Sequence, residues 1–75
     1  MSHKYKSKIS IIFSILEACI DGKRRSHIIS KFALSHSKFK FYSDFLLEKG
    51  FLFIDDEGLM KVSKMGKSFL ERLMN

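Results

Sequence analysis

The sequence predicts a mainly α-helical domain with one small β-hairpin, in the order helix, helix, helix, strand, strand, helix. Three observations predict this fold class: apolar residues recur at helical spacing, serine and glycine stand where these runs begin and end, and two short β-prone runs flank an acidic turn. A chain of 75 residues has the length of one small domain. We therefore expect a single domain over residues 1–75, in which residues 1–6 form a flexible basic arm.

The first helix is expected over residues 7–20, and its apolar run ends at Asp21-Gly22, where glycine can supply a left-handed cap. Its predicted inward set is Ile9, Ile12, Phe13, Leu16 and Ile20. A second apolar row, about 100° away by helical geometry, consists of Ile11, Ile15 and Cys19. Two interpretations fit these rows: a central helix wrapped by the others, or a helix at a subunit interface.

Two more helices are predicted in the middle of the chain, and serine precedes each. Ser26 is the candidate N-cap of a short helix, and Ser35 is the candidate N-cap of a helix that runs to about Lys49. Gly50 ends this third helix, and its predicted inward set is Phe39, Tyr42, Phe45 and Leu46.

The hairpin is predicted from the runs FLFI and LMKV on either side of DDEG, in which Gly58 can take the positive φ that such a turn needs. We expect Leu52 and Ile54 on one face, with Phe51 and Phe53 on the other. Ser63 then caps a last helix, whose apolar edge is Phe69, Leu70, Leu73 and Met74.

The charge of the chain is positive and uneven. The net charge is +6 and the pI is about 9.7, and the whole positive excess lies before Tyr42. Such a charge favours an acidic partner, and nucleic acid is the leading candidate.

The sequence argues against several other classes of protein. Cys19 is the single cysteine, so it cannot form an internal disulfide, and we expect a cytoplasmic protein. The longest apolar run is far shorter than the ~20 residues that span a bilayer, so no membrane partner is expected. Without ligand spacing for zinc, a glycine-rich phosphate loop or a catalytic triad, we expect no metal, no cofactor and no enzyme activity.

Several segments carry a resemblance to a known family. They are the register of Ile12, Ile15 and Leu16, then SHII at 26–29, LS at 34–35, FKFY at 39–42, LLEKGFL at 46–52 and VSKMGKSFL at 62–70. The last two are the most specific, because they recur at this separation across a short hairpin. From Ile9 to Leu70 the sequence resembles the small archaeal winged helix-turn-helix domains, often described as transcription-regulator-like.

The resemblance implies a protein that binds double-stranded DNA, commonly as a homodimer that pairs through terminal helices, with the third helix in the major groove. The third-helix residues expected at the DNA are Ser35, His36, Ser37, Lys38, Lys40, Phe41 and Asp44. The basic residues expected on the backbone are Lys23, Arg24, Arg25 and Lys31. The candidate dimer surface is Ile11, Ile15, Cys19, Phe69, Leu70, Leu73 and Met74.

Two residue patterns depart from this family picture and leave alternatives open. The turn carries three acids, Asp55, Asp56 and Glu57, which would repel phosphates, and Phe41 stands where a polar or basic residue is usual. One alternative is a protein-interaction module that docks through exposed aromatics and the acidic turn. Another is RNA binding, in which exposed aromatics stack on unpaired bases.

Overall fold

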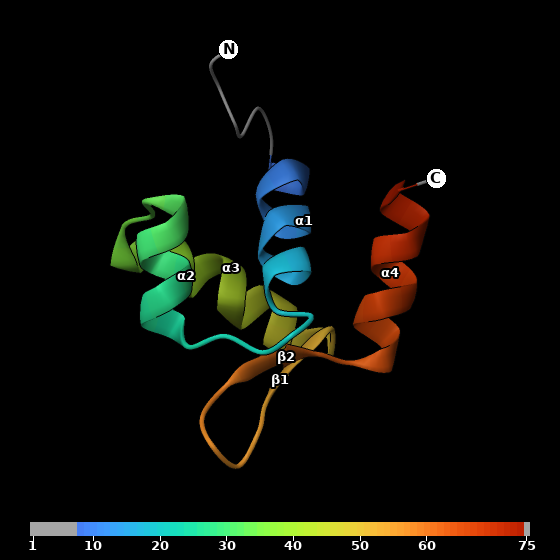
Figure 1. The fold of residues 1–75 in the computed structure, drawn as a ribbon. Helices are drawn as coiled ribbons and strands as arrows, with labels where there is room; N and C mark the ends of the chain where they lie inside the picture. Colours follow the sequence, from blue (N-terminus) through green and yellow to red (C-terminus); the bar gives the residue numbers. More distant parts are fainter. Residues whose placement is uncertain (1–7, 75) are drawn as a thin grey trace.

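The computed structural model describes residues 8–74, and of Met74 it describes the backbone only. The expected arm at residues 1–6 lies outside this range. The helices and strands are α1 (Lys8–Ala18), α2 (Arg25–Phe32), α3 (His36–Glu48), β1 (Leu52–Ile54), β2 (Met60–Val62) and α4 (Lys64–Met74) (Figure 1). This order confirms the predicted fold class.

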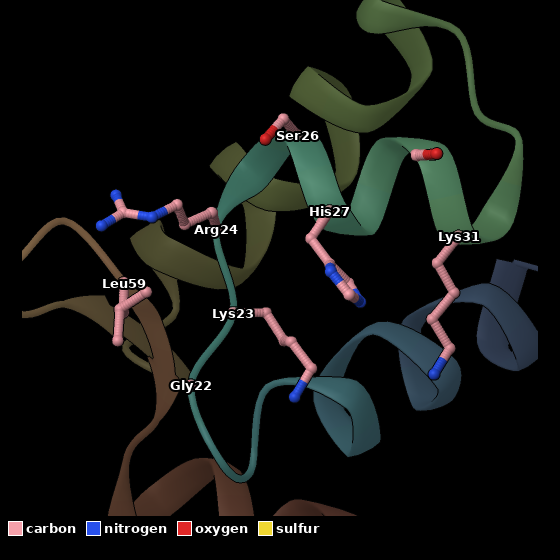
Figure 2. A pocket seen from close by; sticks show the side chains of 8 residues that line it. Gly22, Lys23, Arg24, Ser26, His27, Lys31 and Leu59 are labelled. Carbon is pink, nitrogen blue, oxygen red and sulfur yellow. The ribbon is translucent and has the colours of Figure 1, made fainter.

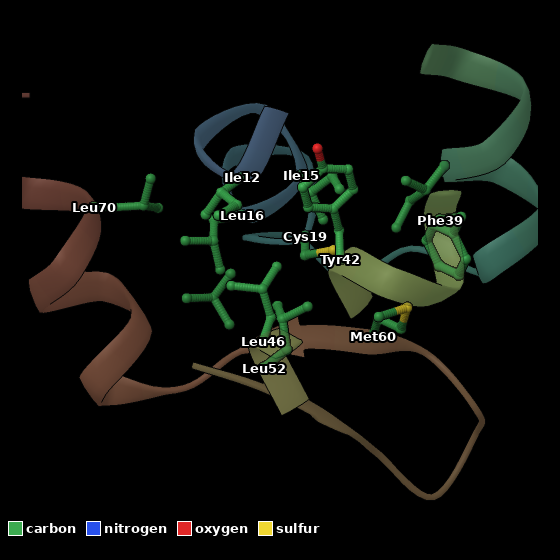
Figure 3. Packing of buried hydrophobic residues seen from close by; sticks show 12 residues of the cluster. Ile12, Ile15, Leu16, Cys19, Phe39, Tyr42, Leu46, Leu52, Met60 and Leu70 are labelled. Carbon is green, nitrogen blue, oxygen red and sulfur yellow. The ribbon is translucent and has the colours of Figure 1, made fainter. Parts of the chain in front are cut away.

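Helix α1 lies at the centre of the core, between Leu70 of α4 on one side and Tyr42 of α3 on the other (Figure 3). Ile9, near the start of α1, and Ile20, in the turn after its end, are 50% and 47% exposed, so the predicted inward set was wrong at both ends. The buried face falls between the two apolar rows of the sequence and consists of Ile12, Ile15, Leu16 and Cys19. The central-helix interpretation of these rows is confirmed.

Helix α2 begins at Arg25, one residue before the serine predicted to cap it. Its N-cap residue is Arg24, in extended backbone and without a side-chain cap. The reason is a β-bridge in which Lys23 and Met60 exchange both backbone hydrogen bonds, with N···O distances of 3.1 and 2.8 Å. Because Lys23 is held extended, the helix starts as soon as this segment ends. At its other end Ala33 takes left-handed backbone, with φ of 52°.

Helix α3 begins and ends as predicted. The hydroxyl of Ser35 accepts the Lys38 amide at 3.1 Å, and Gly50 has a φ of +80° just after the helix. Phe39, Tyr42 and Leu46 are buried as expected, but Phe45 is 37% exposed. The prediction for Phe45 was wrong because this side chain lies at the edge of the buried stripe, where the Lys49 ammonium is 5.8 Å from its ring.

The two strands pair antiparallel, with Leu52 opposite Val62 and Ile54 opposite Met60. Leu52, Met60 and Val62 are buried, whereas Phe53 and Ile54 are 45% and 42% exposed. Phe53 alternates with Leu52 and therefore lies on the opposite face of the hairpin. Because Ile54 is paired with the buried Met60, it lies on the same face as Leu52, as predicted, although its side chain is more exposed. Through the bridge at Lys23, the α1–α2 loop adds a third extended segment to this sheet.

Helix α4 packs closely on the hairpin. The Ser63 hydroxyl accepts the Gly66 amide at 3.0 Å, which confirms the predicted cap. A Cβ at Gly66 would overlap the carbonyl oxygen of Phe51, so only glycine permits this approach. Nearby, the rings of Phe51 and Phe69 stack with centroids 4.6 Å apart.

Candidate nucleic-acid interface

The outward residues of α3 divide between two sides of the helix. His36, Lys40 and Asp44 follow one another at four-residue intervals and line a groove of about 480 Å³ between α2 and α3. Across this groove lie Arg25 and Ser26 from the start of α2. We call this feature the α2–α3 groove. It brings together four of the residues predicted to contact DNA: Arg25, His36, Lys40 and Asp44.

Lys38 and Phe41 belong to the predicted set but do not line the α2–α3 groove. Phe41 is 60% exposed, contacts Tyr42 edge to face, and has the Lys8 ammonium 6.0 Å from its ring centre. It therefore faces the beginning of α1. The structure separates these two residues from His36, Lys40 and Asp44, although all five lie on one helix.

Charges within α3 partly cancel. The Lys40 ammonium contacts the Asp44 carboxylate at 2.9 Å, and both side chains are exposed. Such an exposed i,i+4 pair is worth about 0.3–0.5 kcal/mol to the fold. The paired carboxylate also lowers the positive potential around Lys40.

The four basic residues predicted outside α3 lie on the α1–α2 loop and α2, but they point in different directions. Arg24 extends toward the turn of the hairpin, where its guanidinium donates to the carbonyl oxygen of Glu57 at 3.5 Å (Figure 2). Lys23 and Lys31 extend toward α1 instead (Figure 2). Arg25 alone lines the α2–α3 groove.

The serine hydroxyls also differ in availability. Ser35 is occupied as the cap of α3 and lies 3.5 Å from Ser37, oxygen to oxygen. Ser26 is exposed on the first turn of α2, and its hydroxyl has no partner within residues 8–74. A free hydroxyl beside Arg25 can donate to a phosphate oxygen. The sequence assigned Ser26 to capping, so its free hydroxyl was not predicted.

The acidic turn, residues 55–58, is less negative than its sequence suggests. The Asp55 carboxylate accepts the amides of Glu57 and Leu59, both at 2.9 Å, and contacts the Lys61 ammonium at 3.1 Å. The hydrogen bond from the Leu59 amide, then Lys61 and the Glu57 amide, hold the pKa of Asp55 below its ordinary value of 3.8. Asp55 thus shapes the turn, and of the three acids in the turn only Asp56 and Glu57 are exposed.

Three of the seven residues predicted for the dimer surface are buried in the core of the chain. Ile15, Cys19 and Leu70 are buried, because the second row of α1 packs inward and α4 covers its other side. Burial raises the pKa of the Cys19 thiol to about 11, although Lys23 opposes this shift. Ile11, Phe69 and Leu73 are half-buried, and the side chain of Met74 lies outside the described residues.

The comparison with known families gives one match, to the winged helix-turn-helix family over residues 6–75. The chain belongs to this family. Its helix-turn-helix is α2 and α3, and its wing is the β1–β2 hairpin with the acidic turn. Winged helix-turn-helix domains are typically DNA-binding domains and not enzymes. No curated protein matches the chain.

The described residues contain neither a candidate metal site nor a helix that could cross a membrane. No group of three His, Cys, Asp or Glu side chains within residues 8–74 is arranged to hold a metal ion. None of the helices in the same range has the length and apolar character to cross a membrane.

Proposed function

We propose that the chain is a cytoplasmic regulator of transcription, of the archaeal kind that its sequence resembles, and that it binds double-stranded DNA with α3 in the major groove. The single observation that carries the proposal is the α2–α3 groove in a winged helix-turn-helix domain. His36 and Lys40 line one side of it, and Arg25 with the free Ser26 hydroxyl lines the other. In this arrangement α3 meets base edges and the start of α2 meets the backbone.

The chemistry of the groove suits this division of work. Lys40 and His36 can donate to acceptors on base edges, while the Asp44 carboxylate can accept from a cytosine amino group. Arg25 carries a permanent charge whose donors fit phosphate oxygens. Specificity would then come from α3 and affinity from α2.

The test is a titration of duplex DNA at several salt concentrations. Arg25→Gln/Lys40→Gln is compared with Lys64→Gln/Lys67→Gln, which removes the same charge from exposed positions of α4. We expect the groove variant to bind more weakly and to reduce the steepness of log K against log salt by about one unit, through the lost phosphate contact of Arg25. Equal behaviour of the two variants would contradict a DNA contact in the groove.

We also propose that the DNA-bound form is a homodimer. Ile11, Phe69 and Leu73 keep part of their surface exposed, and they lie on α1 and α4, which carry the two ends of the chain (Figure 1). Sedimentation with and without DNA tests this proposal. A single protomer on a single site at saturation would overturn it.

A protein-interaction module remains the second candidate, and the exposure of Phe41 and Phe53 favours it. Because Asp55 supports the turn, the informative variant is Asp56→Ser/Glu57→Ser. A rise in DNA affinity supports the first proposal, because the two removed acids repel phosphates. Loss of binding to a basic protein partner, with no effect on DNA, would support the second.

A further inference from the structure

Not all basic residues of the α1–α2 loop and α2 line the α2–α3 groove. Lys23, His27 and Lys31 extend to the same side of the segment, toward α1 (Figure 2). They line a separate depression of about 500 Å³, which shares only Ser26 with the α2–α3 groove. Lys31 also borders Glu17 and Ala18 of α1, which places it on the side of α2 turned away from α3.

The lining of this depression consists of donors and small apolar groups. Besides Lys23, His27 and Lys31 it contains Arg24 and the hydroxyls of Ser26 and Ser30, and no carboxylate lines it. Among residues 8–74, neither Lys23 nor Lys31 forms an ion pair, whereas Lys40 and Lys61 each do. Two lysines without an ion pair among the described residues therefore lie outside α3, on the α1–α2 loop and α2.

The position of these donors is fixed by the fold. The two backbone hydrogen bonds between Lys23 and Met60 hold the loop against the sheet, and the Lys31 ammonium lies 5.8 Å from the ring of Phe32. His27 and Lys31 are one helical turn apart, a rise of ~6 Å along α2. A row of this length contacts more than one phosphate of a chain, so it suits a polyanion better than a single small anion.

We propose that Lys23, His27 and Lys31, with the hydroxyl of Ser30, bind a second stretch of nucleic-acid backbone outside the α2–α3 groove. We call this site the Lys23–Lys31 surface. It rests on the proposed function, since it presupposes that the α2–α3 groove binds duplex DNA. The phosphodiester chain can come from a flanking part of the same duplex or from another duplex.

The variant for this test is Lys23→Gln/Lys31→Gln, in which the aliphatic stems are largely kept. Lys64→Gln/Lys67→Gln is again the control. Each is titrated with a short duplex of about one helical turn and with a duplex of about four turns. We expect the variant to lower the salt slope by about two units on the long duplex and by less than one unit on the short duplex.

A second readout separates the two sources of backbone. Two short duplexes, one with a donor dye and one with an acceptor dye, are mixed with the protein. If the control variant shows energy transfer and the Lys23→Gln/Lys31→Gln variant does not, the Lys23–Lys31 surface binds another duplex. If no energy transfer occurs but the variant still has a lower salt slope on the long duplex, the surface binds flanking phosphates of the same duplex.

Three results would overturn the inference. If the variant matches the control on both lengths while Arg25→Gln/Lys40→Gln loses affinity, the α2–α3 groove binds DNA and the Lys23–Lys31 surface does not. If the variant lowers the salt slope equally on the short and the long duplex, the two lysines contact the same stretch of DNA as the α2–α3 groove. If wild-type protein binds neither duplex, the proposed function fails as well.

Discussion

At the scale of single residues, the carboxylate of Asp55 is bound on several sides at once. It accepts two backbone amides of the turn and contacts the Lys61 ammonium, which depresses its pKa. A carboxyl group with a depressed folded pKa stabilises the fold above its unfolded pKa, and this contribution is lost as pH falls through the folded value.

We therefore expect the stability difference between wild type and Asp55→Asn to depend on pH. The amide oxygen of asparagine can still accept the amides of Glu57 and Leu59, but the contact with Lys61 loses its charge. The difference should be full near pH 6 and should shrink as pH falls below about 4. Denaturant unfolding at several pH values measures it, and a constant difference down to pH 2 would refute the assignment.

Ala33 offers a second test at the residue scale, because it holds left-handed backbone between the helices of the helix-turn-helix. This conformation costs a residue with a Cβ about 1–2 kcal/mol, whereas glycine adds ~0.5–1 kcal/mol of backbone entropy. We expect Ala33→Gly to raise the free energy of unfolding by about 0.5–1 kcal/mol. Ala18→Gly, in ordinary helical backbone, should lower it; a loss at both sites would contradict the strain.

At the scale of elements, the helices were more predictable than the surfaces between them. Ser35, Gly50 and Ser63 mark helix ends through bonds made within a few residues, so the sequence revealed them. The start of α2 depends on the bridge to Met60, a contact from a distant segment that no local pattern encodes. The inward face of α1 depends in the same way on how α3 and α4 pack around it.

The contact of α4 with the hairpin gives a prediction at this scale. A methyl group at Gly66 would meet the Phe51 carbonyl oxygen and a methyl group of Val62, so α4 would have to move away. We expect Gly66→Ala to destabilise the chain by about 1–3 kcal/mol, despite the better helix propensity of alanine. Thermal unfolding beside Ser68→Ala, an exposed neighbour, checks this; a stabilised Gly66→Ala would show that α4 packs more loosely.

At the scale of the whole molecule, the candidate site was predicted as a list of residues but not as an arrangement. The charge of the first half of the chain and the family resemblance identified its basic residues as candidates for contact with DNA. They could not show that Lys38 and Phe41 turn away from His36 and Lys40, or that Lys23 and Lys31 separate from Arg25. Those divisions depend on the directions of side chains in the packed molecule.

The balance of charge across the molecule yields one more prediction. Asp44→Asn releases Lys40 from its ion pair, so affinity for random-sequence DNA should rise and the salt slope should steepen by up to about one unit. Glu71→Gln, at an exposed position of α4, makes the same change in net charge and serves as the control. Equal gains in the two variants would mean that only net charge matters and that Lys40 does not reach the DNA.

The bridge between Lys23 and Met60 also has a consequence for folding. The two residues are separated along the chain by α2, α3 and β1, so closing the bridge carries the entropy of a long loop. Helices close their contacts locally and quickly, whereas such a distant pairing comes later. The amides of Lys23 and Met60 should therefore gain protection from hydrogen exchange after those of α3, so the wing completes its sheet only once the helix-turn-helix is in place.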